Sequence, residues 1–202
     1  MALSWDIREK VISMEMWEGI QSRRSISHLE GYVDEEVVRA LIEEAAIWAP
    51  NHHHTEPWHF SVLIGESRKR IGDEWARLAA DELGLTGEAR EKFETKERDK
   101  LLRAPVVVVV SQKVSGSSVQ VQEDHAAVAA AIQNFLLAAH ARGLGARWRT
   151  GKMAYHPWLR EILKLGAQDV VVGLIYLGWP SSNQEIVARP RTKEGLIDWI
   201  IR

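Results

Sequence analysis

Residues 123–151 have the sequence EDHAAVAAAIQNFLLAAHARGLGARWRTG and join a long alanine-rich segment to a short segment that contains arginines. The first part is apolar nearly all round and stops at Gly143, which predicts a helix over 123–142 that is buried on more than one side. We therefore expect this helix to be wrapped by a sheet or covered by a second copy of the chain. The following residues 146–151 predict a short strand.

Three further segments predict strands. The run VVVVV at 106–110, which follows Pro105, is typical of a strand that is buried on both faces. The segment VVVGLIYLG at 170–178 predicts a second buried strand. The segment WHFSVLI at 58–64 is rich in aromatic and β-branched residues and is closed by Gly65, which predicts a third.

Helices are predicted between these strands. Apolar residues at helical spacing, with Asp34 in the capping position, predict a helix over 34–48. The charged segment 67–103 predicts one or two exposed helices, and a further short helix is predicted at 157–165. No internal repeat or linker divides the chain, so we expect one domain over residues 1–202.

The composition limits the classes of function. The chain has 26 Lys and Arg against 28 Asp and Glu, a net charge of −2, so no field of one sign favours nucleic acid or an acidic membrane. It contains no cysteine, which excludes disulfides, thiolate metal sites and cysteine nucleophiles. The N-terminal residues lack the apolar core of a secretory signal, and no apolar stretch is long enough to span a bilayer as a helix. We expect a cytoplasmic protein with a small-molecule partner and no membrane or nucleic-acid partner.

The first candidate for chemistry is the sequence Arg23-Arg24-Ser25. A guanidinium group binds phosphate with two parallel hydrogen bonds, and a serine hydroxyl adds a third, so the three residues suit a phosphate monoester. The alternative interpretation is an ordinary pair of solvated arginines at the end of a helix.

The second candidate is the loop APNHHHTEPWHF, in which His52, His53, His54 and His59 surround Glu56. Consecutive residues of an extended loop point in different directions, so this spacing is poor for tetrahedral zinc. A metal site, a structural loop and a loop that contacts a ligand all stay open as interpretations.

Two further basic segments follow. Trp148 could stack on a planar ring while Arg149 donates to carbonyl oxygens or negative charge, unless this segment is only an edge strand whose charges prevent aggregation. Arg189 and Arg191 flank a proline near the C-terminus, where a basic pair is either a ligand for an anion or simply solvated.

Taken in order, five segments of the chain resemble the nitroreductase family, the FMN-dependent oxidoreductases of nitroaromatics, quinones and related acceptors. The resemblance covers about residues 17 to 201, and its WR[ST]G loop, Trp148 to Gly151, resembles the small bacterial nitroreductases. The segments are RRSISHLE, AIWAPNHHHTEPWHFSVLIG, AAIQNFLLAAHARGLGARWRTG, VVVGLIYLGWP and ARPRTKEGLIDW.

The resemblance implies a cofactor site for FMN. At its phosphate end it implies Arg23 and Ser25 as ligands, with Arg24 on the polar edge of the flavin or on its ribityl chain. The basic pair Arg189 and Arg191 is implied on the same phosphate.

At the ring end the resemblance implies the segment Trp148, Arg149 and Thr150 along the isoalloxazine. Trp48 and His52 match positions in a loop that crosses towards the cofactor of the other subunit. In the family this loop is a small polar run that ends in Gln-Pro-Trp, whereas here it is rich in histidine and ends in Glu56-Pro57-Trp58.

The implied fold is an α+β sandwich, a nitroreductase-like mixed and mainly antiparallel sheet surrounded by helices, in a domain-swapped homodimer with two FMN sites across the interface. The implied reaction transfers hydride from NADH or NADPH to a nitroaromatic, quinone or similar small acceptor by a ping-pong mechanism, with Arg149 stabilising the reduced flavin. No residue is predicted as a general acid or base. The alternatives are a dehalogenase or flavin-degrading enzyme on the same fold, a flavin-binding or sensory module without turnover, and a metallohydrolase built on the histidine-rich loop.

Overall fold

Strand β3 (Val106–Gln112) forms the centre of the sheet in the computed structural model, which describes residues 14–181, 191–192 and 194–201. All seven residues of β3 are buried. They pair antiparallel with β2 (Trp58–Ile64) on one side and with β5 (Val170–Pro180) on the other. The prediction of a fully buried strand from the valine run is confirmed, because β3 has a neighbour at each edge and packing on each face.

The remaining strands extend the sheet from the far edge of β5. The order is β1-β5-β3-β2, with β1 (Leu29–Glu30) and β4 (Gly145–Arg149) both along β5. Strand β5 is long enough for both, since β4 pairs with residues 174–178 and β1 with residues 179–180. All four ladders are antiparallel, and the parallel pairing between described residues is a single bridge from Ser25 to Ala146. The predicted α+β fold with a mainly antiparallel sheet is confirmed.

Helices and helical turns make up most of the rest of the described chain. They are α1 (Met16–Ser22), α2 (Glu35–Glu43), η1 (Ala46–Trp48), η2 (His52–His54), α3 (Glu66–Glu82), α4 (Gly87–Arg98), η3 (Leu101–Arg103), α5 (Ser118–Ala141), α6 (Lys152–Tyr155) and α7 (Pro157–Ile162).

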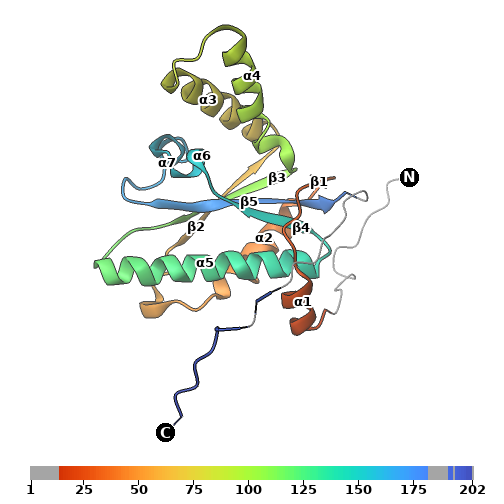
Figure 1. The fold of residues 1–202 in the computed structure, drawn as a ribbon, viewed down its shortest axis with the longest axis vertical. Helices are drawn as coiled ribbons and strands as arrows, with labels where there is room; N and C mark the ends of the chain where they lie inside the picture. The colour runs from red at the N-terminus through yellow and green to blue at the C-terminus, as the bar shows by residue number, and fades with distance from the viewer. Residues whose placement is uncertain (1–13, 182–190, 193, 202) are drawn as a thin grey trace.

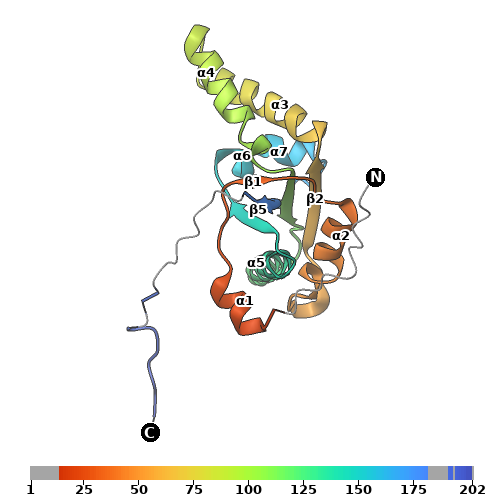
Figure 2. The same cartoon turned by 90° about the vertical axis from the view of Figure 1, so that its right-hand side faces the viewer.

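The sheet separates two apolar cores (Figures 1 and 2). Helix α5 crosses one face and buries Val128, Ile132 and Phe135 against the strands. Helices α6 and α7 and the start of α3 cover the other face, where Val107 and Tyr176 lie in the second core. Within the described residues, no helix is both long and apolar enough to cross a membrane.

Helices α3 and α4 pair with each other and extend away from the sheet (Figure 1). Trp75 of α3 links the two helices, because its indole Nε1 donates to the carboxylate of Glu97 of α4 at 3.0 Å. Lys100 also contacts this carboxylate. The other side of the Trp75 ring faces His156 and Trp158 at the start of α7, so this cluster joins the helical pair to the second core.

Several predicted boundaries differ from the structure. Helix α7 ends at Ile162 rather than 165, and β4 covers Gly145–Arg149 rather than 146–151. Three further differences have a physical reason. Helix α2 ends at Glu43 and is followed by the separate turn η1, because the amide of Asn134 on α5 donates to the carbonyl of Ala45 and the backbone leaves the helical conformation there. Helix α5 begins at Ser118, five residues earlier than predicted, since the Ser117 hydroxyl caps it. Strand β5 continues past Gly178 because β1 pairs with its last residues.

Candidate functional site

An extended segment from Arg23 to Leu29 lies along the outer edge of β4 and organises the site. The Ile26 amide donates to the Ala146 carbonyl at 3.1 Å, and the Arg147 Nη1 donates to the Ser27 hydroxyl at 2.6 Å. Successive side chains of an extended segment point to opposite sides. The segment therefore contributes to two different surfaces, one on each side of the sheet edge.

The first surface is a cluster of positive charge where α1 ends beside the C-terminal half of α5. We call Arg23, Arg24, His140 and Arg191 the cationic cluster. Burial lowers the pKa of the Arg23 guanidinium, and the charges of Arg24 and Arg191 lower it further. Burial, and then Arg23 and Arg24, also lower the pKa of His140. Such mutual repulsion would be relieved by a bound anion.

The described residues supply no carboxylate ion pair to this cluster. The Arg24 Nη1 donates to the backbone carbonyls of Gln21 and Arg23, at 2.6 Å and 2.9 Å. His140 Nε2 lies 2.8 Å from the hydroxyl of Ser22. Because none of these partners is an anion, the positive charge of the cluster is available to a ligand.

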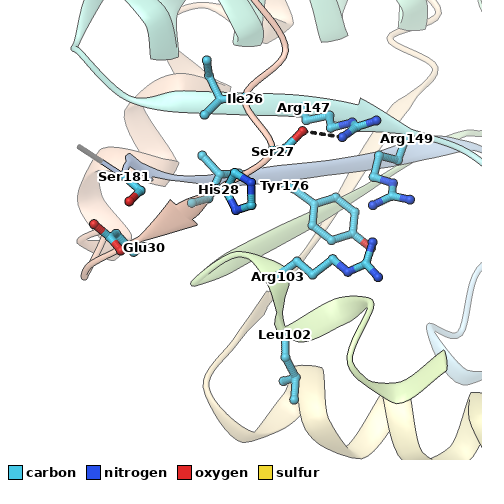
Figure 3. A pocket seen from close by; sticks show the side chains of 11 residues that line it. Ile26, Ser27, His28, Glu30, Leu102, Arg103, Arg147, Arg149, Tyr176 and Ser181 are labelled. Atoms are coloured by element: carbon cyan, nitrogen blue, oxygen red, sulfur yellow. Dashed lines mark hydrogen bonds between the residues drawn. The ribbon is translucent and has the colours of Figure 1, made fainter. Parts of the chain in front are cut away.

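The second surface is a cavity of about 470 Å³ on the side of the sheet away from α5. Arg147 and Arg149 project into it from β4, and Arg103 projects into it from η3 on the facing wall (Figure 3). The rest of the lining mixes apolar with polar side chains: Ile26, Leu29, Leu102, Tyr176, Ser27, His28, Glu30 and Ser181. A cavity of this volume lies within the range of small-molecule sites.

Tyr176 forms the floor of this cavity (Figure 3). Its side chain is 5% exposed, and the Arg149 guanidinium carbon lies 5.5 Å from the centre of its ring. Burial raises the pKa of the Tyr176 hydroxyl, while the charges of Arg149, Arg103 and Arg147 act in the opposite direction. Within the described chain the hydroxyl has no hydrogen-bond partner, so it is free to bind a ligand.

Trp148 lies on the opposite face of β4 from Arg149. Its indole Nε1 covers Gly173 so closely that a Cβ atom there would come within 2.1 Å of it. The indole is partly exposed at the sheet edge, and Thr150 and Gly151 follow at the end of the strand. A planar ligand on one face of β4 can contact only one of the Trp148 and Arg149 side chains. To contact both side chains, it must lie across the edge of the strand.

The histidine-rich loop lies at the other end of α5. His52 Nδ1 lies 2.9 Å from a Glu123 carboxylate oxygen, and the Thr55 hydroxyl donates to the buried carboxylate of Asp124 at 2.5 Å. His53 and His54 have positive φ angles. Among the described residues, no three histidine, aspartate or glutamate side chains form a group that could hold a metal ion.

The loop does not reach the cationic cluster within one chain. Glu123 and His140 are separated by about 26 Å along α5 at the helical rise of about 1.5 Å per residue. His52 therefore lies away from Arg23 in the single chain. Trp48 is 76% exposed and its indole donates to the Glu43 carbonyl.

The structure brings some of the predicted site residues together. Arg23, Arg24 and Arg191 meet in the cationic cluster, and Ser25 adjoins it through its bridge to Ala146. Arg149 reaches the cavity. Arg189 lies outside the described residues.

Sequence reasoning missed Ser27, Arg103, Arg147 and Tyr176. Arg147 had a usable signal, since it is two residues from Arg149 in a predicted strand and therefore shares its face. Tyr176 is the polar side chain in an otherwise apolar run. Arg103 carried no signal, because only the fold brings η3 opposite β4.

Comparisons with known proteins agree with this geometry. Residues 20–179 match the model of the nitroreductase family. The chain is 30% identical over 168 residues to the Escherichia coli protein named "Putative NAD(P)H nitroreductase YdjA", covering 83% of this chain and 89% of that protein.

Solved structures give the same result. The nitroreductase-like family protein from Bacillus cereus superposes with a TM-score of 0.74 at 34% identity, covering 88% of this chain and 92% of that one. A "putative nitroreductase in complex with fmn" from Desulfovibrio desulfuricans gives 0.62 at 29% identity, covering 86% and 91%.

Proposed function

Because the chain belongs to the nitroreductase family, we infer that it is an FMN-dependent oxidoreductase that takes its electrons from NADH or NADPH. The observation that carries this inference is the pair of surfaces on one extended segment, a cationic cluster and a ring-sized cavity. FMN has a matching pair of features, a phosphate at one end and a flat polar-edged ring at the other. The residues present therefore fit the cofactor.

At the phosphate end, we assign Arg23, Ser25 and Arg191 as ligands, with Arg24 beside them. The lowered pKa of Arg23 supports this assignment, because burial and two neighbouring positive charges act on a group that lacks a counterion among the described residues. A phosphate dianion relieves that repulsion and accepts charge-assisted hydrogen bonds. Arg189 is assigned here on the resemblance alone.

At the ring end, we assign Trp148, Arg149 and Thr150 to the isoalloxazine. When bound, FMN supplies a centre that accepts hydride and passes it on. The protein contributes electrostatic and steric effects. Arg149 places positive charge in a cavity whose floor is the buried Tyr176, and this charge would stabilise the negative charge of the reduced cofactor. The absence of a Cβ atom at Gly173 lets the Trp148 indole pack closely against β5.

We further propose that each site is completed by a second copy of the chain. Trp48 and His52 are assigned to the cofactor of the partner, which agrees with the distance of His52 from Arg23 within one chain. An uncovered stripe on α5, made of Ala126, Ala130, Gln133 and Leu137, supports a homodimer, since residues at this spacing share one helix face.

The acceptors proposed are nitroaromatics, quinones and similar small molecules. Each acceptor would be reduced after the oxidised donor has left the site. Because donor and acceptor use one cavity, each would leave before the other binds, which gives ping-pong kinetics. Initial rates measured over a grid of NADH or NADPH against a quinone test this. Parallel double-reciprocal lines are expected. Intersecting lines would show that both substrates are bound together and would contradict a shared site.

A further inference from the structure

The cavity holds more positive charge than the flavin uses. Three arginines line it, and Glu30 at the end of β1 is the carboxylate in its lining. In the proposed function Arg149 serves the ring of the cofactor, and Arg147 is held by its hydrogen bond to the Ser27 hydroxyl. Arg103 is left without an assigned ligand.

Arg103 is suited to binding an anion. Within the described chain its side chain makes no ion pair or hydrogen bond, although it is close enough to Tyr176 to act on the pKa of that hydroxyl. It comes from η3, on the wall that faces β4 across the cavity (Figure 3). An arginine fork on one wall and a free tyrosine hydroxyl on the floor together match the two oxygens of a carboxylate.

The walls around these polar groups indicate what carries the carboxylate. Leu102 is adjacent to Arg103, and Ile26 and Leu29 lie on the side of the extended segment. These three apolar side chains, among otherwise polar lining residues, can contact the flat body of an aromatic molecule that carries the carboxylate.

We propose that Arg103, with the Tyr176 hydroxyl, makes this enzyme selective for aromatic acceptors that carry a carboxylate. This proposal rests on the proposed function, because it concerns the acceptor that enters the same cavity. Arg103 is a specificity residue in it, and the reduction itself does not depend on Arg103.

A matched pair of acceptors tests the proposal. 4-Nitrobenzoate and 4-nitrobenzamide differ in charge and are close in shape, so the ratio of their kcat/KM values isolates the contribution of the carboxylate. We expect the FMN-loaded enzyme to favour the acid by about tenfold, the lower end of what a charge-assisted hydrogen bond contributes. This preference should weaken in high salt, because the Arg103 side chain is exposed and its charge is screened.

Arg103→Gln should remove most of that preference, mainly by lowering kcat/KM for the acid. Arg39→Gln is the matched control, since Arg39 is an exposed arginine on α2, on the other side of the sheet. A wild-type enzyme that does not distinguish the two acceptors would overturn the proposal. So would an Arg103→Gln variant that keeps the full preference.

Binding of the same two compounds separates this proposal from the proposed function. Quenching of protein or flavin fluorescence gives their dissociation constants without turnover. If neither compound is reduced but the acid still binds about tenfold more tightly through Arg103, the proposed reaction fails and the carboxylate site stands. If both are reduced and bind equally, the reaction stands and the carboxylate site fails.

Discussion

Arg23 is the residue on which the assignment of the phosphate site depends most directly. Its partly buried guanidinium lies among other positive charges, and its pKa is lowered for that reason. We expect Arg23→Ala to weaken FMN binding by about 1.5–3 kcal/mol, the contribution of one hydrogen bond between charged groups. Titration of apoprotein with FMN measures the change, with Arg39→Ala as the control. Equal FMN affinity in Arg23→Ala and the control would remove Arg23 from the site.

Arg149 tests the ring end of the site. Its guanidinium is held over the Tyr176 ring inside the cavity. Arg149→Gln keeps a hydrogen-bond donor but removes the charge that favours the reduced cofactor, so the midpoint potential should fall. A loss of about 1.4 kcal/mol would correspond to about 30 mV for a two-electron couple. A redox titration of FMN-loaded protein gives the value, and a potential equal to that of the parent would show that Arg149 has no influence on the flavin.

Single residues also show where sequence reasoning stops. Arg23, Arg24 and Ser25 could be predicted because they are adjacent and because two arginines followed by a hydroxyl have a clear chemistry. Arg103 could not be predicted, since it is 44 residues from Arg147 in the sequence and only the sheet brings their walls together. Local spacing identifies residues that act together in one strand, whereas a cavity between elements follows from the fold.

At the scale of elements, the helical pair α3 and α4 depends on the buried carboxylate of Glu97. Burial would raise the pKa of Glu97, but the hydrogen bonds from Lys100 and Trp75 outweigh it and hold that pKa below its ordinary value. The unfolded chain therefore takes up the proton at a higher pH than the folded chain does. The stability that Glu97 contributes is present above the ordinary pKa and is lost as the pH falls through the lowered value.

Glu97→Gln should lower the free energy of unfolding at neutral pH by about 1 kcal/mol, because the two hydrogen bonds lose their ionic character. The difference between variant and parent should shrink as the solution is made acidic. Urea unfolding followed across a pH series measures both quantities. Glu91→Gln, an exposed change on α4, is the control. A difference that stays constant through the acidic range would contradict the role given to the Glu97 carboxylate.

The elements themselves were predictable where one signal dominated. The valine run of β3 and the alanine-rich part of α5 each have a single consistent pattern, and both formed as expected. The first turn of α5 was missed because Ser118 to Gln122 contain too few apolar residues to show a helical period. The end of α2 was missed for a different reason, since a side chain from α5 terminates it and local sequence does not contain that contact.

At the scale of the whole molecule, we propose that each site combines the phosphate and ring ends from one chain with Trp48 and His52 of a second copy. The apolar side chains Trp17, Trp48 and Ile200 are 75%, 76% and 98% exposed in the single chain. Contact with a second copy of the chain would remove these side chains from water. Their exposure agrees with a homodimer in which α5 and the chain ends are covered by the partner.

Gln133→Glu should weaken this dimer, since it places a charge in the middle of the uncovered α5 stripe without entering the core of the single chain. Ala130→Glu, one turn away, should do the same more strongly. Both variants should also lose FMN, because each site is completed by the other copy. Light scattering with a simultaneous flavin spectrum measures mass and FMN content together.

Ala89→Glu on the exposed side of α4 introduces the same charge elsewhere and should leave both quantities unchanged. A folded wild-type monomer with a full complement of FMN would contradict the shared site.

The central claim, that this chain is an FMN enzyme that carries electrons from a nicotinamide donor to an acceptor, is tested most directly by its two half-reactions. FMN-loaded protein is mixed without oxygen with one equivalent of NADH or NADPH, and a quinone is added after the absorbance has settled. We predict that the yellow absorption of the flavin bleaches in the first step and returns in the second, with one equivalent of quinone reduced. Protein that cannot be loaded with FMN, or whose flavin is bleached by neither donor, would contradict the claim.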